Sequence, residues 1–328
     1  MKVRWVTDYD LDGNRLGFSV HNRKAREAFA DAGGALDESA RVAVHVASPA
    51  SWRPLKGRMN ILYTAWESPE LPAALAAGAA RADAIIVPAR FLIEVFERAT
   101  GRPVRCCPLG VDAELFRYTS HPRRPGGRFR FLWVGAPNAR KGWPCVAEAW
   151  EALTRAHSHG DIDFDCELYV KTTVTEKLAD LGNGVTWDSW RLPERELARL
   201  YAEAHCFLFP TMGEGFGLTL AEAMAAGLPC IYTPWTAAGE LMAPGCGWPL
   251  RYGTERIALD GGLGEAVFAR ADSQDLAAKM LRVLRSPREA ALRGRRAARR
   301  VREQFTWQRT GSALLGILEE ISCLQAAS

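Results

Sequence analysis

Two glutamates lie eight positions apart in a segment whose residue types suit a phosphorylated sugar ligand. Glu214 stands among three glycines, Gly213, Gly215 and Gly217, and glycine permits tight turns and a close approach of backbone to ligand. Glu222 follows in a stretch rich in helix formers. Carboxylates accept hydrogen bonds from hydroxyl groups. Two of them at different depths could therefore hold two sets of hydroxyls, as in a sugar and a ribose joined by a diphosphate.

The elements around these glutamates form a strand, a loop, a helix and a second strand. An apolar run over residues 206–209 predicts a buried parallel strand before the loop. The helix predicted over 218–226 ends at Gly227, and Pro229 prevents its continuation before the apolar run 230–232. In such a unit the helix N-terminus faces the crevice beyond the strand ends. Its free N–H groups and the positive end of its dipole favour a phosphate there.

Similar units alternate along the rest of the chain and predict an α/β fold with parallel sheets. In the first half we expect strands at 3–6, 42–46, 60–64 and 84–88, with helices at 20–32, 71–82 and 90–99. In the second half we expect strands at 129–135, 166–170 and 185–187, with helices at 144–153 and 194–204.

Length and composition agree with a globular protein of two domains. The chain has 328 residues, of which 48% are hydrophobic and 24% are charged, and its net charge is +4. It has no apolar run of membrane-spanning length and no signal-peptide pattern at its start, so a cytoplasmic location is expected. The eight cysteines are scattered without Cys-x-x-Cys spacing, so neither a zinc site nor a disulfide framework is predicted.

The glutamate segment resembles the signature of the retaining glycosyltransferases of family 4. The similar stretches are Glu-Gly-Phe-Gly-Leu from residue 214 and Glu-Ala-Met-Ala-Ala-Gly-Leu-Pro from residue 222. The resemblance is strongest over residues 129–240, and it implies the GT-B architecture of two Rossmann-like domains facing across a cleft. The first would span 1–112, with a helix over about 308–328 packing back on it, and the second would span 113–307.

The resemblance implies transfer of a sugar, with retention of configuration, from a nucleotide-diphosphate donor to an acceptor hydroxyl. The donor would be UDP- or GDP-linked, the acceptor a glycan, a lipid-linked sugar or a small molecule, and no metal or other cofactor would be needed. By this resemblance Glu214 contacts the transferred sugar and Glu222 holds the ribose. Lys141 contacts the diphosphate, where a fixed cation suits the negative charge that grows on the leaving group.

The chain departs from the family pattern at several positions. Relatives often carry an arginine directly after the strand glycine, here Gly135, but this chain has Ala136, and Arg140 is the candidate replacement. No histidine occupies the place in the first domain where relatives often use one, and Glu67 is the candidate there. Gly17 is the candidate glycine near the donor phosphates. Residues 236–240, Thr-Ala-Ala-Gly-Glu, replace the more usual glycine-rich turn before a glutamate.

The remaining donor contacts are expected at the nucleobase and at the start of the signature helix. Trp190 could stack on the base, but it could equally be a packed core residue. The loop and first helical turn would contribute Gly215, Phe216, Gly217, Leu218 and Thr219.

Two other functions stay open. The region 282–302 contains nine arginines, and a basic helix there could contact a membrane or nucleic acid, so that a nucleic acid or a protein would be the acceptor. A solvated helix face would have the same composition. Alternatively, Ala136 and the missing histidine could mark a module that binds a nucleotide sugar without catalysis.

Overall fold

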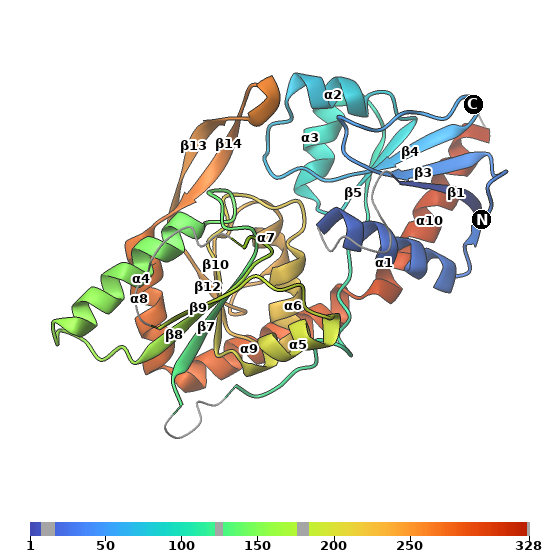
Figure 1. Ribbon diagram of the computed structural model, residues 1–328. Helices are drawn as coiled ribbons and strands as arrows, with labels where there is room; N and C mark the ends of the chain where they lie inside the picture. The colour runs from blue at the N-terminus through green and yellow to red at the C-terminus, as the bar shows by residue number, and fades with distance from the viewer. Residues whose placement is uncertain (8–16, 122–126, 176–183, 327–328) are drawn as a thin grey trace. The chain divides into compact units, whose positions relative to one another are not determined.

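A computed structural model describes residues 1–7, 17–121, 127–175 and 184–326. The chain folds into two compact units (Figure 1). Unit 1 consists of residues 1–110, 256–267 and 304–328, and unit 2 of residues 111–255 and 268–303. Each contains its own parallel sheet with helices, so the predicted α/β class with two parallel-sheet domains is confirmed.

Unit 1 is built on a six-stranded sheet in the order β2-β1-β3-β4-β5-β6, with every pair parallel. Its central strands are buried apolar runs, as expected where helices cover both faces of a sheet. The strands are β1 (Lys2–Thr7), β2 (Ala35–Leu36), β3 (Val42–Val46), β4 (Met59–Tyr63), β5 (Ala84–Val87) and β6 (Val104–Cys106). The helices are α1 (Gly17–Asp31), α2 (Ala73–Ala79), α3 (Phe91–Thr100) and α10 (Trp307–Ala326).

The last helix, α10, packs closely on α1 within unit 1. A Cβ atom added at Gly311 of α10 would lie 2.0 Å from the carbonyl oxygen of Ala28 in α1. A Cβ at Gly110 would likewise lie 2.2 Å from the backbone nitrogen of Trp307. The C-terminal helix therefore lies against the N-terminal helix, and both contacts require a residue without a side chain.

A hairpin was not foreseen from the sequence. Strands β13 (Tyr252–Ala258) and β14 (Glu265–Ala271) pair with one another around a short 3-10 turn, η1 (Asp260–Gly262). Its tip, residues 256–267, belongs to unit 1 and not to the second domain predicted for it. Within unit 1, Arg256 makes a bidentate ion pair with Glu70 (Nη1–Oε2 2.9 Å, Nη2–Oε1 3.0 Å), and Ser68 Oγ donates to the carbonyl of Val267 at 2.8 Å. Because these partners are far apart in the sequence, no local sequence pattern predicts the two contacts.

Unit 2 contains a second six-stranded parallel sheet, in the order β12-β11-β10-β7-β8-β9. One side of its core is filled by aromatic side chains, among them Phe131, Trp133, Trp143 and Trp150. The strands are β7 (Phe129–Val134), β8 (Cys166–Lys171), β9 (Val185–Asp188), β10 (Cys206–Phe209), β11 (Cys230–Tyr232) and β12 (Trp248–Pro249). The helices are α4 (Trp143–Ser158), α5 (Glu194–Glu203), α6 (Leu218–Ala226), α7 (Thr236–Leu241), α8 (Ser273–Arg285) and α9 (Pro287–Gln304).

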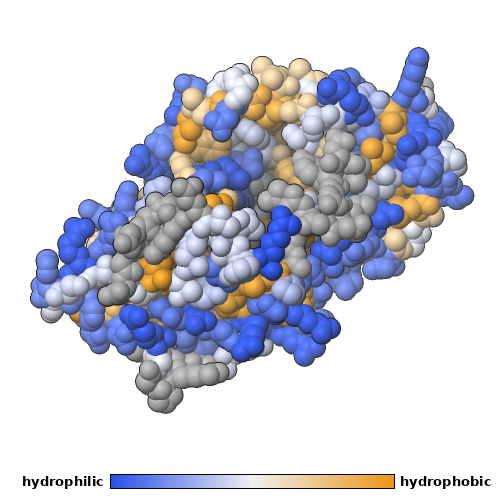
Figure 2. All heavy atoms as spheres, in the orientation of Figure 1, coloured by the Kyte–Doolittle hydropathy of each residue, from blue (hydrophilic) through white to orange (hydrophobic). Residues whose placement is uncertain are grey.

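The single basic helix expected over 282–302 is wrong, because the region is divided between α8 and α9. The break falls at Ser286, whose helical conformation is disfavoured by the following Pro287. Helix α9 buries small residues, and its arginines at 288, 295, 296, 299 and 302 are exposed. Hydrophilic side chains prevail along the lower edge of Figure 2, where α9 lies in Figure 1.

The close packing of α10 on α1 predicts opposite effects of one substitution at two glycines of the same helix. Gly311→Ala should lower the free energy of unfolding by about 1–3 kcal/mol, since its Cβ would collide with backbone. Gly316→Ala should raise it by roughly 0.5–1 kcal/mol, since a Cβ at Gly316 meets nothing within 4 Å and alanine favours a helix. Urea unfolding measures both values, and equal effects of the two variants would contradict this packing.

Candidate donor site in unit 2

The loop between β7 and α4 is held against the segment that follows β10. Gly142, at the start of α4, has a φ of 74°, which favours glycine. A Cβ there would lie 1.9 Å from the carbonyl oxygen of Pro210. The carbonyl of Arg140 accepts a hydrogen bond from the Met212 N–H at 2.8 Å. The glycine after Lys141 is therefore required by close packing, which places the two preceding basic residues beside the glutamate loop.

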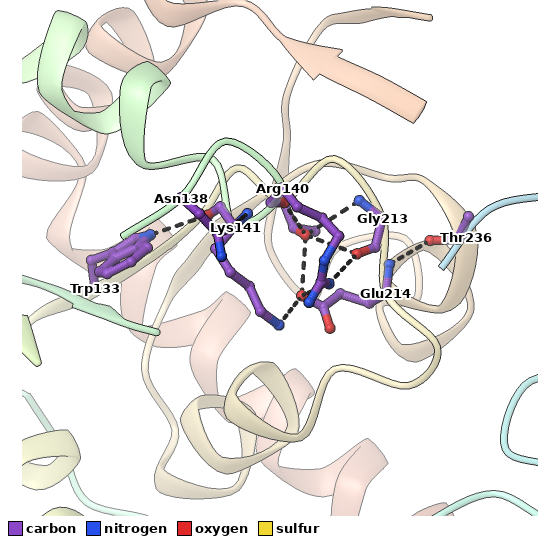
Figure 3. A network of polar contacts seen from close by, with 8 residues as sticks. Trp133, Asn138, Arg140, Lys141, Gly213, Glu214 and Thr236 are labelled. Atoms are coloured by element: carbon purple, nitrogen blue, oxygen red, sulfur yellow. Dashed lines mark hydrogen bonds and ion pairs between the residues drawn. The ribbon is translucent and has the colours of Figure 1, made fainter. Parts of the chain in front are cut away.

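Lys141 and Glu214 form an ion pair at the centre of this contact (Figure 3). Lys141 Nζ lies 2.6 Å from Glu214 Oε1, and the hydroxyl of Thr211 lies 3.1 Å from the same oxygen. Arg140 Nη1 donates to the carbonyl of Gly213 at 3.2 Å and lies 4.0 Å from Glu214 Oε1. The structure thus brings together three residues that the sequence analysis selected: Lys141, Arg140 and Glu214.

The surroundings of Glu214 keep its carboxylate ionised. Its side chain is only 8% exposed, and burial by itself would raise its pKa. The charges of Lys141 and Arg140, with hydrogen bonds from Lys141 and Thr211, outweigh burial and lower the pKa below its ordinary value. The Glu214 carboxylate is therefore ionised at neutral pH and paired with Lys141.

Helix α6 begins directly after the glycine loop. Gly217 is its N-cap with a φ of 94°, a conformation that a residue with a side chain adopts only at a cost. Phe216 is buried in the loop, Gly215 precedes it, and Leu218 and Thr219 lie half-buried in the first turn. The first N–H groups of a helix have no partner within it and carry a partial positive charge. This helix start is therefore suited to an anion, as the sequence predicted.

Glu222 lies on α6 beside a buried phenol. Tyr201, from α5, donates its hydroxyl proton to Glu222 Oε2 at 2.8 Å. Burial raises the pKa of Glu222 to about 7, the hydrogen bond from Tyr201 opposes this rise, and the charge of Glu194 adds to it. The carboxyl of Glu222 therefore titrates near neutral pH, whereas that of Glu214 is already ionised there.

Trp190 extends into solvent with 80% of its surface exposed, so the interpretation as a packed core residue is wrong. Its backbone is nevertheless held. Its N–H donates to Asp188 Oδ1 at 3.0 Å, and its carbonyl accepts from the buried ammonium of Lys171. Lys171 Nζ also donates to the carbonyls of Thr172 (2.9 Å) and Asp188 (3.2 Å) at the ends of β8 and β9. An exposed aromatic ring on a fixed backbone is suited to stacking.

The other predicted residues are divided between the units. Gly135 lies beside Lys141, because a Cβ there would be 3.7 Å from Lys141 Cγ. Gly17 is the first residue of α1 in unit 1, and Glu67 lies half-buried in the loop after β4 of the same unit. The contributions of Gly17 and Glu67 to a site with Lys141 stay predictions.

Sequence reasoning missed Thr211, Lys171 and Tyr201, which organise the site, and it named Thr236 only as the start of the segment 236–240, without a role for its side chain. Two of them carried a signal. Tyr201 lies on the buried face of α5, and a buried phenol needs a hydrogen-bond partner. Lys171 ends an apolar strand, where a lysine has to satisfy its charge. Thr211 and Thr236 are ordinary loop residues in the sequence.

In the ranges that the structure describes, no three His, Cys, Asp or Glu side chains gather as a metal site would require. No helix in this part of the chain is long and apolar enough to cross a bilayer. Metal independence of the reaction stays a prediction.

Comparison with known sequences identifies relatives of one kind. The family model described as glycosyl transferases group 1 matches residues 128–286. The chain is 32% identical over 227 residues to the MMP alpha-(1->4)-mannosyltransferase of Mycolicibacterium hassiacum, covering 67% of this chain and 49% of that protein. It is 28% identical over 251 residues to the GDP-mannose-dependent alpha-(1-6)-phosphatidylinositol dimannoside mannosyltransferase of Mycobacterium tuberculosis, covering 73% and 58%. The chain thus spans about half the length of these curated relatives.

Solved structures agree on the fold. HepE of Anabaena, in complex with UDP-glucose, matches with a TM-score of 0.71 at 13% identity, covering 98% of this chain and all of that one. The segment 128–286 therefore belongs to the glycosyl transferases of group 1, and the chain's two parallel-sheet units are those of the GT-B fold.

Proposed function

We propose that the protein is a retaining glycosyltransferase of family 4 that moves mannose from GDP-mannose to a hydroxyl of a carbohydrate or other acceptor. The observation that carries this proposal is the Lys141–Glu214 ion pair beside the N-terminus of α6. The choice of mannose is supported by the relatives, whose names specify mannosyl transfer, and the choice of GDP by the one that depends on GDP-mannose.

Each group at the site has a task in this reaction. Lys141 and the N–H groups at the start of α6 would stabilise the charge that develops on the leaving diphosphate. Glu214 would accept hydrogen bonds from the hydroxyls of the transferred sugar, and Glu222 from those of the ribose. Since an ammonium has three donors, Lys141 can contact the diphosphate and keep its bond to Glu214.

The proposed chemistry needs no additional reactant. The bond between the sugar's anomeric carbon and the diphosphate oxygen breaks, and a bond from that carbon to the acceptor oxygen forms on the same face. The acceptor's proton passes to an oxygen of the leaving phosphate, and GDP is released. The protein then contributes positioning and electrostatic stabilisation.

Transfer onto a nucleic acid or a protein is the second candidate. It is favoured by the exposed arginines of α9, which would suit an anionic partner. DNA binding that weakens steeply with added salt would support this candidate. Binding that is absent at low salt would argue against it.

The first test measures donor binding and turnover together. GDP-mannose should raise the unfolding midpoint of the wild type by mass action, and UDP-glucose should raise it less. Lys141→Ala should reduce kcat by about 10²–10³, the usual cost of removing one group that stabilises transition-state charge. Lys56→Ala, an exposed lysine of unit 1, is the matched control and should leave kcat unchanged. Donor binding without any transfer or hydrolysis would indicate a non-catalytic module.

The pKa of Glu222 predicts a pH-dependent affinity. Ribose hydroxyls donate to a carboxylate, so binding favours the ionised form, and affinity for GDP should rise by about tenfold between about pH 6 and pH 8. The same raised pKa makes the ligand-free protein less stable as pH rises from 4.5 to about 7, because the folded state binds the proton more tightly than the unfolded chain. Calorimetric titration measures the affinity. Glu222→Gln should flatten the profile, and an unchanged profile in that variant would assign it to another group.

The exposure of Trp190 predicts an effect on binding alone. Trp190→Ala should weaken GDP affinity by roughly 3- to 10-fold, the range expected for one aromatic stack, and Trp190→Phe should retain most of it. Since the ring is 80% exposed, the unfolding midpoint without ligand should not change. A loss of stability equal to the loss of affinity would show that the ring is a packing residue.

A further inference from the structure

Thr236 adopts an unusual backbone conformation close to the proposed site. Its φ is 50°, and within the described ranges it is the only non-glycine residue with a positive φ. This left-handed region disfavours side chains, and β-branched ones most of all. Thr236 is the first residue of α7. A residue held in such a conformation needs compensating interactions.

The start of α7 makes its compensating interactions with the backbone of Glu214. The Thr236 hydroxyl accepts a hydrogen bond from the backbone N–H of Glu214, with an Oγ1–N distance of 3.0 Å (Figure 3). The carbonyl of Glu214 accepts from the N–H of Ala237 at 3.3 Å. Both backbone groups of Glu214 are thus tied to the first two residues of α7. Because Glu214 is buried, its N–H would be left without a partner if the hydroxyl were absent, and such a loss is costly.

The side chain of Glu214 is held from the opposite direction. Its Oε1 contacts the ammonium of Lys141 and the hydroxyl of Thr211. With the peptide fixed by Thr236 and one carboxylate oxygen fixed by Lys141, the second oxygen, Oε2, has a defined direction. A glycine at position 236 would relieve the backbone but would offer the Glu214 N–H no acceptor.

We propose that Thr236 is a positioning residue that fixes Glu214 for contact with the transferred sugar, at the cost of local backbone strain. The inference rests on the proposed function. Thr236 itself does not have to touch the donor, since its hydroxyl acts through the Glu214 peptide. A glycine would suit this backbone better, but only a residue with a hydroxyl supplies the acceptor for the Glu214 N–H.

Three variants of the full chain separate strain from positioning. Thr236→Ser keeps the hydroxyl, and its kcat with GDP-mannose should stay within about twofold of the wild type. Thr236→Gly and Thr236→Ala both remove it, and kcat should fall by about tenfold or more in each. Thr236→Gly should nevertheless unfold about 2–4 °C above Thr236→Ala without ligand, because only alanine keeps the unfavourable conformation.

A second measurement distinguishes positioning from general damage. GDP lacks the sugar that Glu214 would contact, so its affinity should be the same in the wild type and all three variants. Thr254→Ala, at an exposed position of β13, controls for the loss of a threonine and should not change kcat.

Three results would overturn the inference. A Thr236→Gly protein as fast as the wild type would show that the hydroxyl has no part in turnover. A Thr236→Ser protein as slow as Thr236→Ala would show that the oxygen is not the active feature, and a parallel loss of GDP affinity would show disruption of the whole loop. If the wild type transfers no sugar from any donor, the proposed function fails first and this inference fails with it.

Discussion

The buried carboxylate of Glu214 is the constraint on which the rest of the site depends. A carboxylate that is 8% exposed is tolerated only with an opposite charge and hydrogen bonds around it. The charged partners, Lys141 and Arg140, come from the loop after β7, which must therefore lie against the loop after β10. The neighbouring positions of β7 and β10 in the sheet supply that proximity, and Gly142 allows the final approach to Pro210. The order of strands in the parallel sheet thus brings the two partners of the Lys141–Glu214 ion pair together.

Features that depend on local chemistry could be predicted from the sequence. The buried strands are short apolar runs, and the segments that carry Lys141 and Glu214 each end in a glycine with positive φ, Gly142 and Gly217. Features that depend on distant partners could not. The hairpin tip is fixed by Glu70 and Ser68, nearly two hundred residues earlier in the chain. The backbone of Trp190 is held in part by Lys171, 19 residues earlier in the chain, a contact that the neighbours of Trp190 in sequence do not reveal.

The two signature glutamates differ in protonation because their partners differ. Burial pushes both pKa values upward. At Glu214 an ammonium and a guanidinium reverse the effect, whereas at Glu222 a neutral phenol is too weak to do so. The same residue type in one short motif therefore has two electrostatic states, and neither could be assigned from the motif alone. The groups that decide the two pKa values, Lys141 and Tyr201, lie on other elements of unit 2.

In the proposed reaction this difference would set what each glutamate has to do when a donor binds. Glu214 is already ionised, paired and tied through its peptide to Thr236, so little reorganisation is needed before it can accept hydroxyl hydrogen bonds. In the proposed reaction Glu222 would have to lose a proton to become a full acceptor, and the ribose hydroxyls would supply the hydrogen bonds that favour this loss. Preorganisation at the sugar and adjustment at the nucleoside would then divide the two requirements of the proposed transfer. Under this proposal the position of the reacting carbon would be fixed in advance, while the affinity for the released nucleotide would stay adjustable.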